Sequence, residues 1–275
     1  MKINKKFQPL RFIMRAKSLL YPLQFLCSCL LFSPICGAST PNPFHDSNFI
    51  FEPIYGNGNY LQHSNFIDKK NIKIIFEVGS RDAIDAVRLG YYYQCPVYAF
   101  ECNPQAVEIC NHNVKNYPFV TVVPLACWHE STTLPFYPVV ESHGGTYPVN
   151  IGGSSLLKTL PNGVDAHHKQ GKPTMVQAIR LDNWMEENNI SQIDLLCMDT
   201  QGATLHVLQG LGEKLTKIKY IITEAYLQPS FEGEALYPEI KEMLVKAGFE
   251  VAKEPSPHAV FTDVLFINKK MRELR

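Results

Sequence analysis

From Ile72 onward, short apolar runs alternate with segments patterned as helices, and this alternation constrains the fold more than any other feature of the chain. We expect strands at 72–78, 96–100, 119–125, 193–198 and 218–223, and helices at 83–93, 104–116, 203–215 and 236–247. Strands that alternate with helices are typical of βαβ units. The sequence therefore predicts an α/β protein with a mostly parallel sheet, with 249–254 and 259–268 as an antiparallel hairpin at its edge.

Composition narrows the class of protein further. A chain of 275 residues can bury a large core, and we expect one main domain. Residues 1–38 hold six basic and no acidic side chains, which leaves 20 basic against 26 acidic side chains in the rest. A net acidic body gives no electrostatic reason to bind nucleic acid, so we expect no nucleic-acid partner.

The cysteine content argues against a small fold that is held together by disulfides or by zinc. Outside the first 38 residues the cysteines are Cys95, Cys102, Cys110, Cys127 and Cys197. An odd number without a CxxC pair fits neither a disulfide framework nor a zinc knuckle. We expect most of these residues to be buried thiols.

The leader at 1–38 has the order of a secretory signal. Basic residues precede an apolar run at 19–35, and small residues follow at 36–38, so cleavage after Ala38 is plausible. The alternative is an uncleaved anchor at 18–38, although Pro22 and Pro34 interrupt a continuous helix. Both readings predict a chain that is exported, secreted or periplasmic, or that associates with a membrane through 18–38.

Two further segments lack sustained periodicity. Residues 39–70 are rich in Asn, Pro and Gly and read as an extended lead-in, which places the main domain at 71–270. Residues 141–173 are too long and too glycine-rich for an ordinary connection. Loops of that kind are often lids or binding loops, so we expect this one to cover a site.

Polar residues follow the predicted strands and mark where chemistry can occur. They are Glu77 to Asp82 after the first strand, Glu101 to Pro104 after the second, Asp199 to Gly202 after the fourth, and Glu224 after the fifth. In open parallel sheets, ligands bind at the carboxyl ends of the strands, where the strand order reverses. We therefore expect these residues to share one site.

The residue types favour a nucleoside ligand with an amino-acid tail. An acid such as Glu101 at the end of a second strand can accept two hydrogen bonds from ribose hydroxyls. Gly79 and Ser80 would let a ligand carboxylate approach backbone amide groups. The phosphate-binding GxGxxG and GxxxxGK[ST] patterns are absent, so the pattern suits S-adenosylmethionine better than a dinucleotide.

Structural roles compete with these assignments. A strand-end acid often caps a helix or forms a surface ion pair, and Asp199 is placed to cap a helix beginning near Gly202. The adjacent His167 and His168 have no nearby Cys or acid cluster, so we expect them to be solvent-exposed and predict no metal site. His206, inside a predicted helix, reads as structural.

An ordered set of motifs resembles one known family. The motifs are "IFEVGSRDAIDA", "YAFECNPQAVEIC", "GGSSLL", "AIRLDNWM", "IDLLCMDTQGATLHVLQG", "IITEAY" and "LVKAGFEV", within about residues 72–266. Together they resemble the FkbM-type S-adenosylmethionine-dependent methyltransferases. This resemblance implies a class I methyltransferase (Rossmann-like) fold, with a seven-stranded, mostly parallel sheet and an antiparallel last strand.

The resemblance also implies roles for individual residues. Glu77 and Gly79 would line the methionine end of the cofactor, Glu101 would hold the ribose, and Ala126 would lie by the adenine. We also expect Ser80 and Asn103 to bind the cofactor. Asp199 would lie where methyl donor and acceptor meet. As the group that orients or deprotonates the acceptor, Asp199 is the first candidate and Glu224 the second.

Three positions depart from the family pattern. Met198 and Thr204 replace a lysine and an acid, because "CMDTQGAT" stands where the family usually has "KIDVEGAE" or "KIDVQGAE", and Ala83 stands where a second glycine is common. We therefore consider two hypotheses. One is an O-methyltransferase acting on a hydroxyl of a sugar, glycan or related small molecule, and the other is a catalytically lapsed methyltransferase-like binding module at the cell surface or outside the cytosol. A nicotinamide-dependent oxidoreductase is disfavoured without the phosphate loop.

Overall fold

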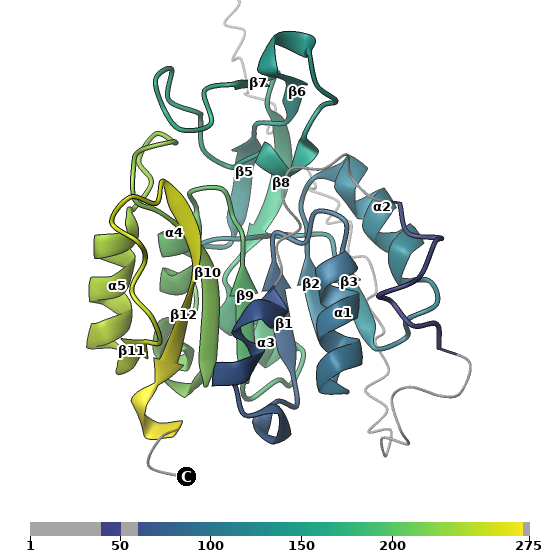
Figure 1. The fold of residues 1–275 in the computed structure, drawn as a ribbon, viewed down its shortest axis with the longest axis vertical. Coiled ribbons are helices and arrows are strands. Elements are labelled where there is room, and N and C mark those ends of the chain that lie inside the picture. Colours follow the sequence, from purple (N-terminus) through teal and green to yellow (C-terminus); the bar gives the residue numbers. More distant parts are fainter. Residues whose placement is uncertain (1–39, 51–59, 272–275) are drawn as a thin grey trace, which may run out of the picture. The chain divides into compact units, whose positions relative to one another are not determined.

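The computed structural model describes residues 40–50 and 60–271, and its centre is a seven-stranded sheet in the order β11-β12-β10-β9-β1-β2-β3 (Figure 1). The strands are β1 (Ile75–Val78), β2 (Val97–Phe100), β3 (Val120–Val123), β9 (Leu195–Met198), β10 (Tyr220–Tyr226), β11 (Phe249–Val251) and β12 (Phe261–Asn268). β12 is antiparallel to both of its neighbours, whereas the pairs from β10 to β3 are parallel. The predicted sheet, with its antiparallel last strand and edge hairpin, is confirmed.

Helices cover both faces of this sheet because side chains alternate along each strand. Their bounds are α1 (Ile84–Tyr93), α2 (Pro104–Val114), α3 (Leu181–Glu187), α4 (Thr204–Gln209) and α5 (Tyr237–Lys246). Ile75 packs into a core with α1, and the next residue, Phe76, packs into a core on the opposite face with α3, α4 and α5. The parallel strands are therefore buried on both faces, as their near-continuous apolar sequences require.

Two small sheets lie beyond the main one (Figure 1). They are built from β4 (Ala126–Cys127), β5 (Thr132–Phe136) and β8 (Thr174–Ile179), and from β6 (Val139–Ser142) and β7 (His168–Gln170). Short 3-10 turns complete the fold: η1 (Tyr60–Phe66), η2 (Lys69–Asn71), η3 (His143–Gly145), η4 (Ile151–Gly153), η5 (Gly212–Lys217) and η6 (Lys269–Met271). The segment 141–173, expected as a loop, thus carries β7, η3 and η4.

Two of the differences from the predicted element boundaries have a clear physical reason. The helix expected at 203–215 ends at Gln209 and gives way to η5, because Gly212 has a positive φ of 49° that interrupts the helix. β10 continues to Tyr226 through its pairing with β12, so Glu224 lies inside the strand and not after it. The apolar run ends at Ile222, but the antiparallel partner extends the strand over polar residues.

The lead-in packs on the main domain where it is described. Phe49, Tyr60 and Ile67 are buried in the same core as α1. The predicted signal or anchor at 1–38 lies outside the described residues. Among the residues that are described, no helix combines the length and apolarity needed to cross a bilayer.

A buried carboxylate joins the amino ends of three central strands. Asp194 Oδ2 accepts hydrogen bonds from the backbone N–H groups of Lys73, at 2.7 Å, and Ile74, at 3.2 Å, just before β1. Its Oδ1 pairs with Lys219 Nζ at 2.8 Å, next to the start of β10. The Asp194 side chain is only 2% exposed, so these bonds form away from water.

We predict that Asp194→Ala lowers the free energy of unfolding by about 3–5 kcal/mol, because it removes the ion partner of Lys219 and leaves two N–H groups unpaired. Urea denaturation of the full chain measures this change. Glu242→Ala, which removes an exposed ion pair with Lys246, is the control and should leave the midpoint unchanged. A loss below about 1 kcal/mol for Asp194→Ala would show that the carboxylate does not hold these strands together.

Candidate active site

A cavity of about 640 Å³ opens at the carboxyl ends of β1, β2 and β9, within the range of small-molecule sites. It lies where the strand order reverses, since β1 pairs with β2 on one side and β9 on the other. Residues 150–156, in the segment expected to cover a site, form part of its wall. The cavity therefore opens at the edge of the sheet where the sequence predicts a site.

The turn after β1 is in close contact with the residue that follows β9. Gly79 has a φ of 85°, and a Cβ atom at this position would lie 1.8 Å from the carbonyl oxygen of Asp199. The Asp199 N–H in turn donates to the carbonyl of Val78 at 3.0 Å. Only glycine permits this approach, which brings Asp199 to the mouth of the β1 turn.

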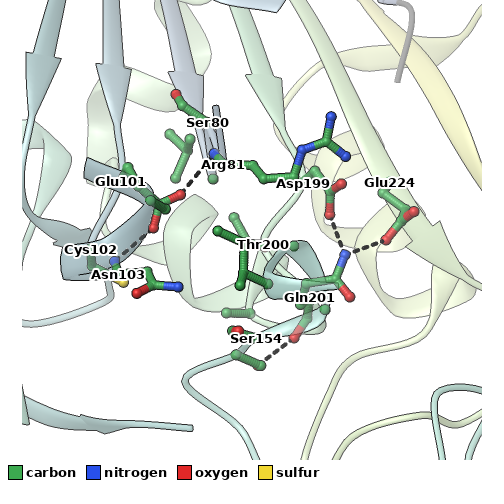
Figure 2. A pocket seen from close by; sticks show the side chains of 18 of the residues that line it. Ser80, Arg81, Glu101, Cys102, Asn103, Ser154, Asp199, Thr200, Gln201 and Glu224 are labelled. Atoms are coloured by element: carbon green, nitrogen blue, oxygen red, sulfur yellow. Dashed lines mark hydrogen bonds between the residues drawn. The ribbon is translucent and has the colours of Figure 1, made fainter. Parts of the chain in front are cut away.

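Glu101 organises the turns after β1 and β2 (Figure 2). Its Oε2 accepts from the Arg81 N–H at 2.8 Å, and its Oε1 accepts from the Asn103 N–H at 2.7 Å. Burial raises the pKa of Glu101, and these backbone hydrogen bonds oppose that effect. A backbone hydrogen bond from Cys102 also reaches the carboxylate, but a carboxylate has about four lone-pair sites, so the structural and ligand-binding roles of Glu101 are compatible.

Several buried polar atoms beside the cavity have no hydrogen-bond partner among the described residues. They are Glu77 Oε2, Arg81 Nε and Asn103 Nδ2. Glu77 is 2% exposed, and burial raises its pKa well above the usual range, with a further contribution from Asp85. Orphaned buried polar groups are costly, so their concentration here points to a ligand that satisfies them.

At the other end of the cavity, Gln201 bridges two carboxyl groups (Figure 2). Its Nε2 donates to Asp199 Oδ1 at 2.6 Å and to Glu224 Oε2 at 3.3 Å. The Gln201 side-chain oxygen lies 3.2 Å from the Tyr226 hydroxyl, and its backbone carbonyl accepts from Ser155 Oγ at 2.6 Å. Gln201 is thus in contact with Tyr226 of β10 and with Ser155 of the segment 141–173.

Close packing of acids alters their protonation. Burial and the charge of Asp199 raise the pKa of Glu224 well above its ordinary value. Burial also raises the pKa of Asp199, although Gln201 and Arg81 oppose the shift, and it raises the pKa of Asp263 to about 6. Glu224 is consequently the protonated member of the pair and Asp199 the better acceptor of a proton.

All of the predicted site residues line this one cavity. They are Glu77, Gly79, Ser80, Glu101, Asn103, Ala126, Asp199 and Glu224. The interpretation of Asp199 as a helix cap is wrong: α4 has Ala203 at its N-cap, and the Asp199 carboxylate bonds to Gln201 instead. Asn103 does cap α2, its side-chain oxygen accepting from Gln105 N at 3.1 Å, and its Nδ2 has no hydrogen-bond partner among the described residues.

The cavity residues that sequence reasoning missed include Tyr60, Asp165 and Tyr226. Tyr226 follows Glu224 by two positions in β10, so strand periodicity would have placed both on one face. Tyr60 comes from the lead-in and Asp165 from the long loop. Neither segment has a period that would reveal a buried polar position.

The histidine pair also differs from expectation. His167 is exposed as predicted, but His168 is only 6% exposed and lines the cavity. Burial lowers the pKa of His168 to about 4, with a contribution from the charge of His167. β7 begins at His168 and pairs with β6, and this pairing turns the side chain inward.

The other structural assignments hold. His206 lies in α4 and stacks on Trp128 with a ring-centroid distance of 3.7 Å. All five cysteines of the described chain are free thiols, four of them buried. Burial raises the pKa of Cys127 and Cys197, which makes these thiols poor nucleophiles.

Comparisons with known proteins place the chain among methyltransferases. Residues 65–251 match the family described as the methyltransferase FkbM domain. The 2-O-methyltransferase NoeI of Sinorhizobium fredii (strain NBRC 101917 / NGR234) is 29% identical over 201 residues, or 72% of this chain and 80% of that protein. Methyltransferase sdnD of Sordaria araneosa is 26% identical over 189 residues, or 59% of this chain and 68% of that protein.

The chain is also similar to solved structures with which it shares little sequence. M. capricolum TrmK, in complex with the natural cofactor product S-adenosyl-homocysteine, is 12% identical with a TM-score of 0.41. That match covers 76% of this chain and 66% of the other. A putative RNA methyltransferase from Pyrococcus horikoshii is 12% identical with a TM-score of 0.40, covering 76% of this chain and 81% of the other.

The raised pKa of Glu224 predicts a pH-dependent penalty on folding. Above its ordinary pKa of 4.5, the folded chain retains a proton that the unfolded chain has lost. The folded state thus loses stability as pH rises, by at most about 1.4 kcal/mol per pH unit. Glu224→Gln removes this effect, so the unfolding free energy of the variant minus that of the wild type should increase between about pH 5 and pH 8.

Urea denaturation across this pH range measures the difference. Lys246 lowers the pKa of Glu242, which therefore titrates below the range, so Glu242→Gln should give a pH-independent difference. A pH-independent difference for Glu224→Gln as well would contradict the raised pKa.

Proposed function

The chain belongs to the FkbM methyltransferase domain family, and from that premise we propose that it methylates a hydroxyl oxygen of a sugar, glycan or related small molecule. Membership makes it an S-adenosylmethionine-dependent methyltransferase. The choice of oxygen and of acceptor class is our proposal. One observation carries it: Asp199 and Glu224, bridged by Gln201, face the same cavity as the turn at Gly79.

The residues after β1 and β2 fit the cofactor. Glu77 Oε2 is buried and unpaired among the described residues, and it would accept hydrogen bonds from the ammonium group of the methionine moiety. The lone pairs left on Glu101 suit the ribose hydroxyls, and Ala126, which lines the cavity at the start of β4, offers an apolar contact for the adenine. Asn103 Nδ2 is a further donor without a protein partner in the described chain.

Bound S-adenosylmethionine supplies a methyl group activated by a sulfonium, and its transfer to oxygen depends chiefly on positioning. This chain positions the acceptor with acids and amides. Asp199 accepts the hydrogen bond, and then the proton, of the acceptor hydroxyl. Glu224, kept protonated by burial and by Asp199, is a donor to a second oxygen of the acceptor.

Acid and amide side chains of this kind are typical partners for hydroxyl-rich molecules, because each hydroxyl both donates and accepts. The printed name of the relative from Sinorhizobium fredii, a 2-O-methyltransferase, also supports an oxygen acceptor. Together these two observations favour a sugar or glycan over an acceptor that offers nitrogen or carbon.

The departures from the family pattern lie outside the cavity. Met198 is fully buried in the core beneath the sheet, and Thr204 bonds to Thr200 Oγ1 at 3.1 Å and Thr223 Oγ1 at 3.3 Å. Neither side chain is among those that line the cavity. We therefore propose an active enzyme, and cofactor binding without methyl transfer to any supplied acceptor would favour the alternative of a lapsed binding module.

We predict that Asp199→Asn lowers turnover by roughly 10²–10⁴-fold while cofactor affinity changes far less, because the amide cannot accept a proton. The assay follows labelled methyl transfer from S-adenosylmethionine to a panel of sugars and oligosaccharides. Calorimetry with S-adenosylhomocysteine monitors the cofactor site. Near-normal turnover in a folded variant would exclude Asp199 from catalysis.

We predict that Glu101→Gln weakens S-adenosylhomocysteine binding at least about tenfold, since charge-assisted hydrogen bonds to the ribose contribute about 1.5–3 kcal/mol each. The matched control is Glu232→Gln, an exposed acid outside the cavity. Calorimetry on both full-length variants gives the comparison. Equal affinities with intact folds would limit Glu101 to its contacts with Arg81 and Asn103.

A further inference from the structure

Three potential metal ligands meet in the loop that covers the acceptor end of the cavity. Asp165, His167 and His168 each offer one ligand atom, and these atoms lie within 4.8 Å of one another. All three residues line the same cavity as Asp199 and Glu224. The grouping follows from a tight turn, in which the His168 N–H donates to the Asp165 carbonyl at 2.8 Å.

Both imidazoles are held by their Nδ1 atoms. His167 Nδ1 lies 3.2 Å from the carbonyl oxygen of Val164, which can only accept, so this nitrogen carries the hydrogen. His168 Nδ1 lies 3.0 Å from Ser142 Oγ, which also accepts from the Asn150 N–H at 3.0 Å. For His167, donation from Nδ1 to a backbone oxygen leaves Nε2 as the ligand atom, which is the usual support of a metal-binding histidine. His168 Nε2 lies 3.5 Å from the Asn150 side-chain amide nitrogen, a donor, so the same tautomer serves there and a cation would take the place of this amide contact.

Hydrogen bonds to protein groups also orient the Asp165 carboxylate. Tyr226 and Ser230 both donate their hydroxyl hydrogens to Asp165 Oδ2, each at 2.7 Å. Ser230 Oγ also accepts from the Asp165 backbone N–H at 3.0 Å. Oδ1 makes no hydrogen bond within the described residues, so the carboxylate is oriented by one oxygen and open at the other.

From this arrangement we propose that Asp165, His167 and His168 bind one divalent cation of the zinc type at the acceptor end of the cavity. Two imidazoles and one carboxylate suit zinc and similar transition metals, whereas magnesium and calcium prefer oxygen ligands. Three protein ligands leave a coordination position open. An oxygen of the acceptor completes the coordination sphere, and this part of the proposal rests on the proposed function.

The sequence predicted no metal site, because Asp165 is the one acid close to the histidine pair and does not form an acid cluster with it. The fold supplies what the pattern lacked, since β10 and the segment after it contribute Tyr226 and Ser230 as supports for Asp165. Tyr226 also links Asp165 to the catalytic candidates, because its hydroxyl lies 3.2 Å from the Gln201 side-chain oxygen. A cation here would therefore be coupled to the group that bridges Asp199 and Glu224.

The test is a metal titration of the full chain after treatment with EDTA. Cobalt(II) should bind with about one equivalent and give visible absorption bands of four-coordinate cobalt, and zinc should displace it. His167→Ala, at an exposed position that folding tolerates, should weaken zinc binding at least about tenfold, as should Asp165→Asn. His258→Ala removes an exposed histidine outside the cavity and should leave the affinity unchanged.

Two outcomes overturn the proposal. One is no cobalt spectrum and no zinc heat in the wild type, and the other is equal zinc affinity in the wild type, His167→Ala and Asp165→Asn. Millimolar magnesium that competes with cobalt would refute the zinc-type assignment. S-adenosylhomocysteine binding, measured separately without metal, should be unchanged in His167→Ala, so a failed metal site and a failed cofactor site give different results.

Discussion

The close approach of the β1 turn to the residue after β9 is the constraint on which the site depends. Gly79 meets the Asp199 carbonyl where any side chain would collide, and Asp199 donates its N–H back to Val78. This contact sets the N–H groups of the β1 turn, the Glu101 carboxylate and the Asp199 carboxylate around one cavity. Without it, the polar residues that follow separate strands would have no common geometry.

That geometry concentrates acids in a buried space. Glu77, Asp85, Asp199, Glu224 and Asp263 all line the cavity, and burial raises the pKa of each. Arg81 offsets only part of this cost, and its guanidinium is paired with Asp82 at 3.3 Å. A ligand with a sulfonium and an ammonium group complements such a cavity, because each positive charge stabilises ionised carboxylates that folding alone disfavours.

The sheet and its polar edge could be predicted because they depend on local patterns. Apolar runs of strand length placed Glu101 and Asp199 at strand ends, and parallel pairing then brings those ends together. Glu224 was misplaced relative to its strand because β10 is lengthened by β12, a partner about 40 residues away in the chain. The end of the helix before Gly212 could not be predicted either, because the helical pattern of the sequence continues through this residue.

The acceptor side was less predictable, because long-range hydrogen bonds build it. Asp165 is oriented by Tyr226 and Ser230, and His168 by Ser142, and none of these partners is adjacent in sequence. Tyr60 reaches the cavity from a lead-in with no periodic signal. Such positions become visible only when the fold has brought the segments together.

The central claim is that the turns after β1, β2 and β9 form the cofactor site with the acceptor space beside Asp199. A crystal structure of the full chain with S-adenosylhomocysteine tests it most directly. We predict ribose hydroxyls within hydrogen-bond distance of Glu101, adenine beside Ala126, and the cofactor sulfur facing the space bounded by Asp199 and Glu224. A cofactor product bound elsewhere, or no binding at saturating concentration by a folded chain, would contradict the account.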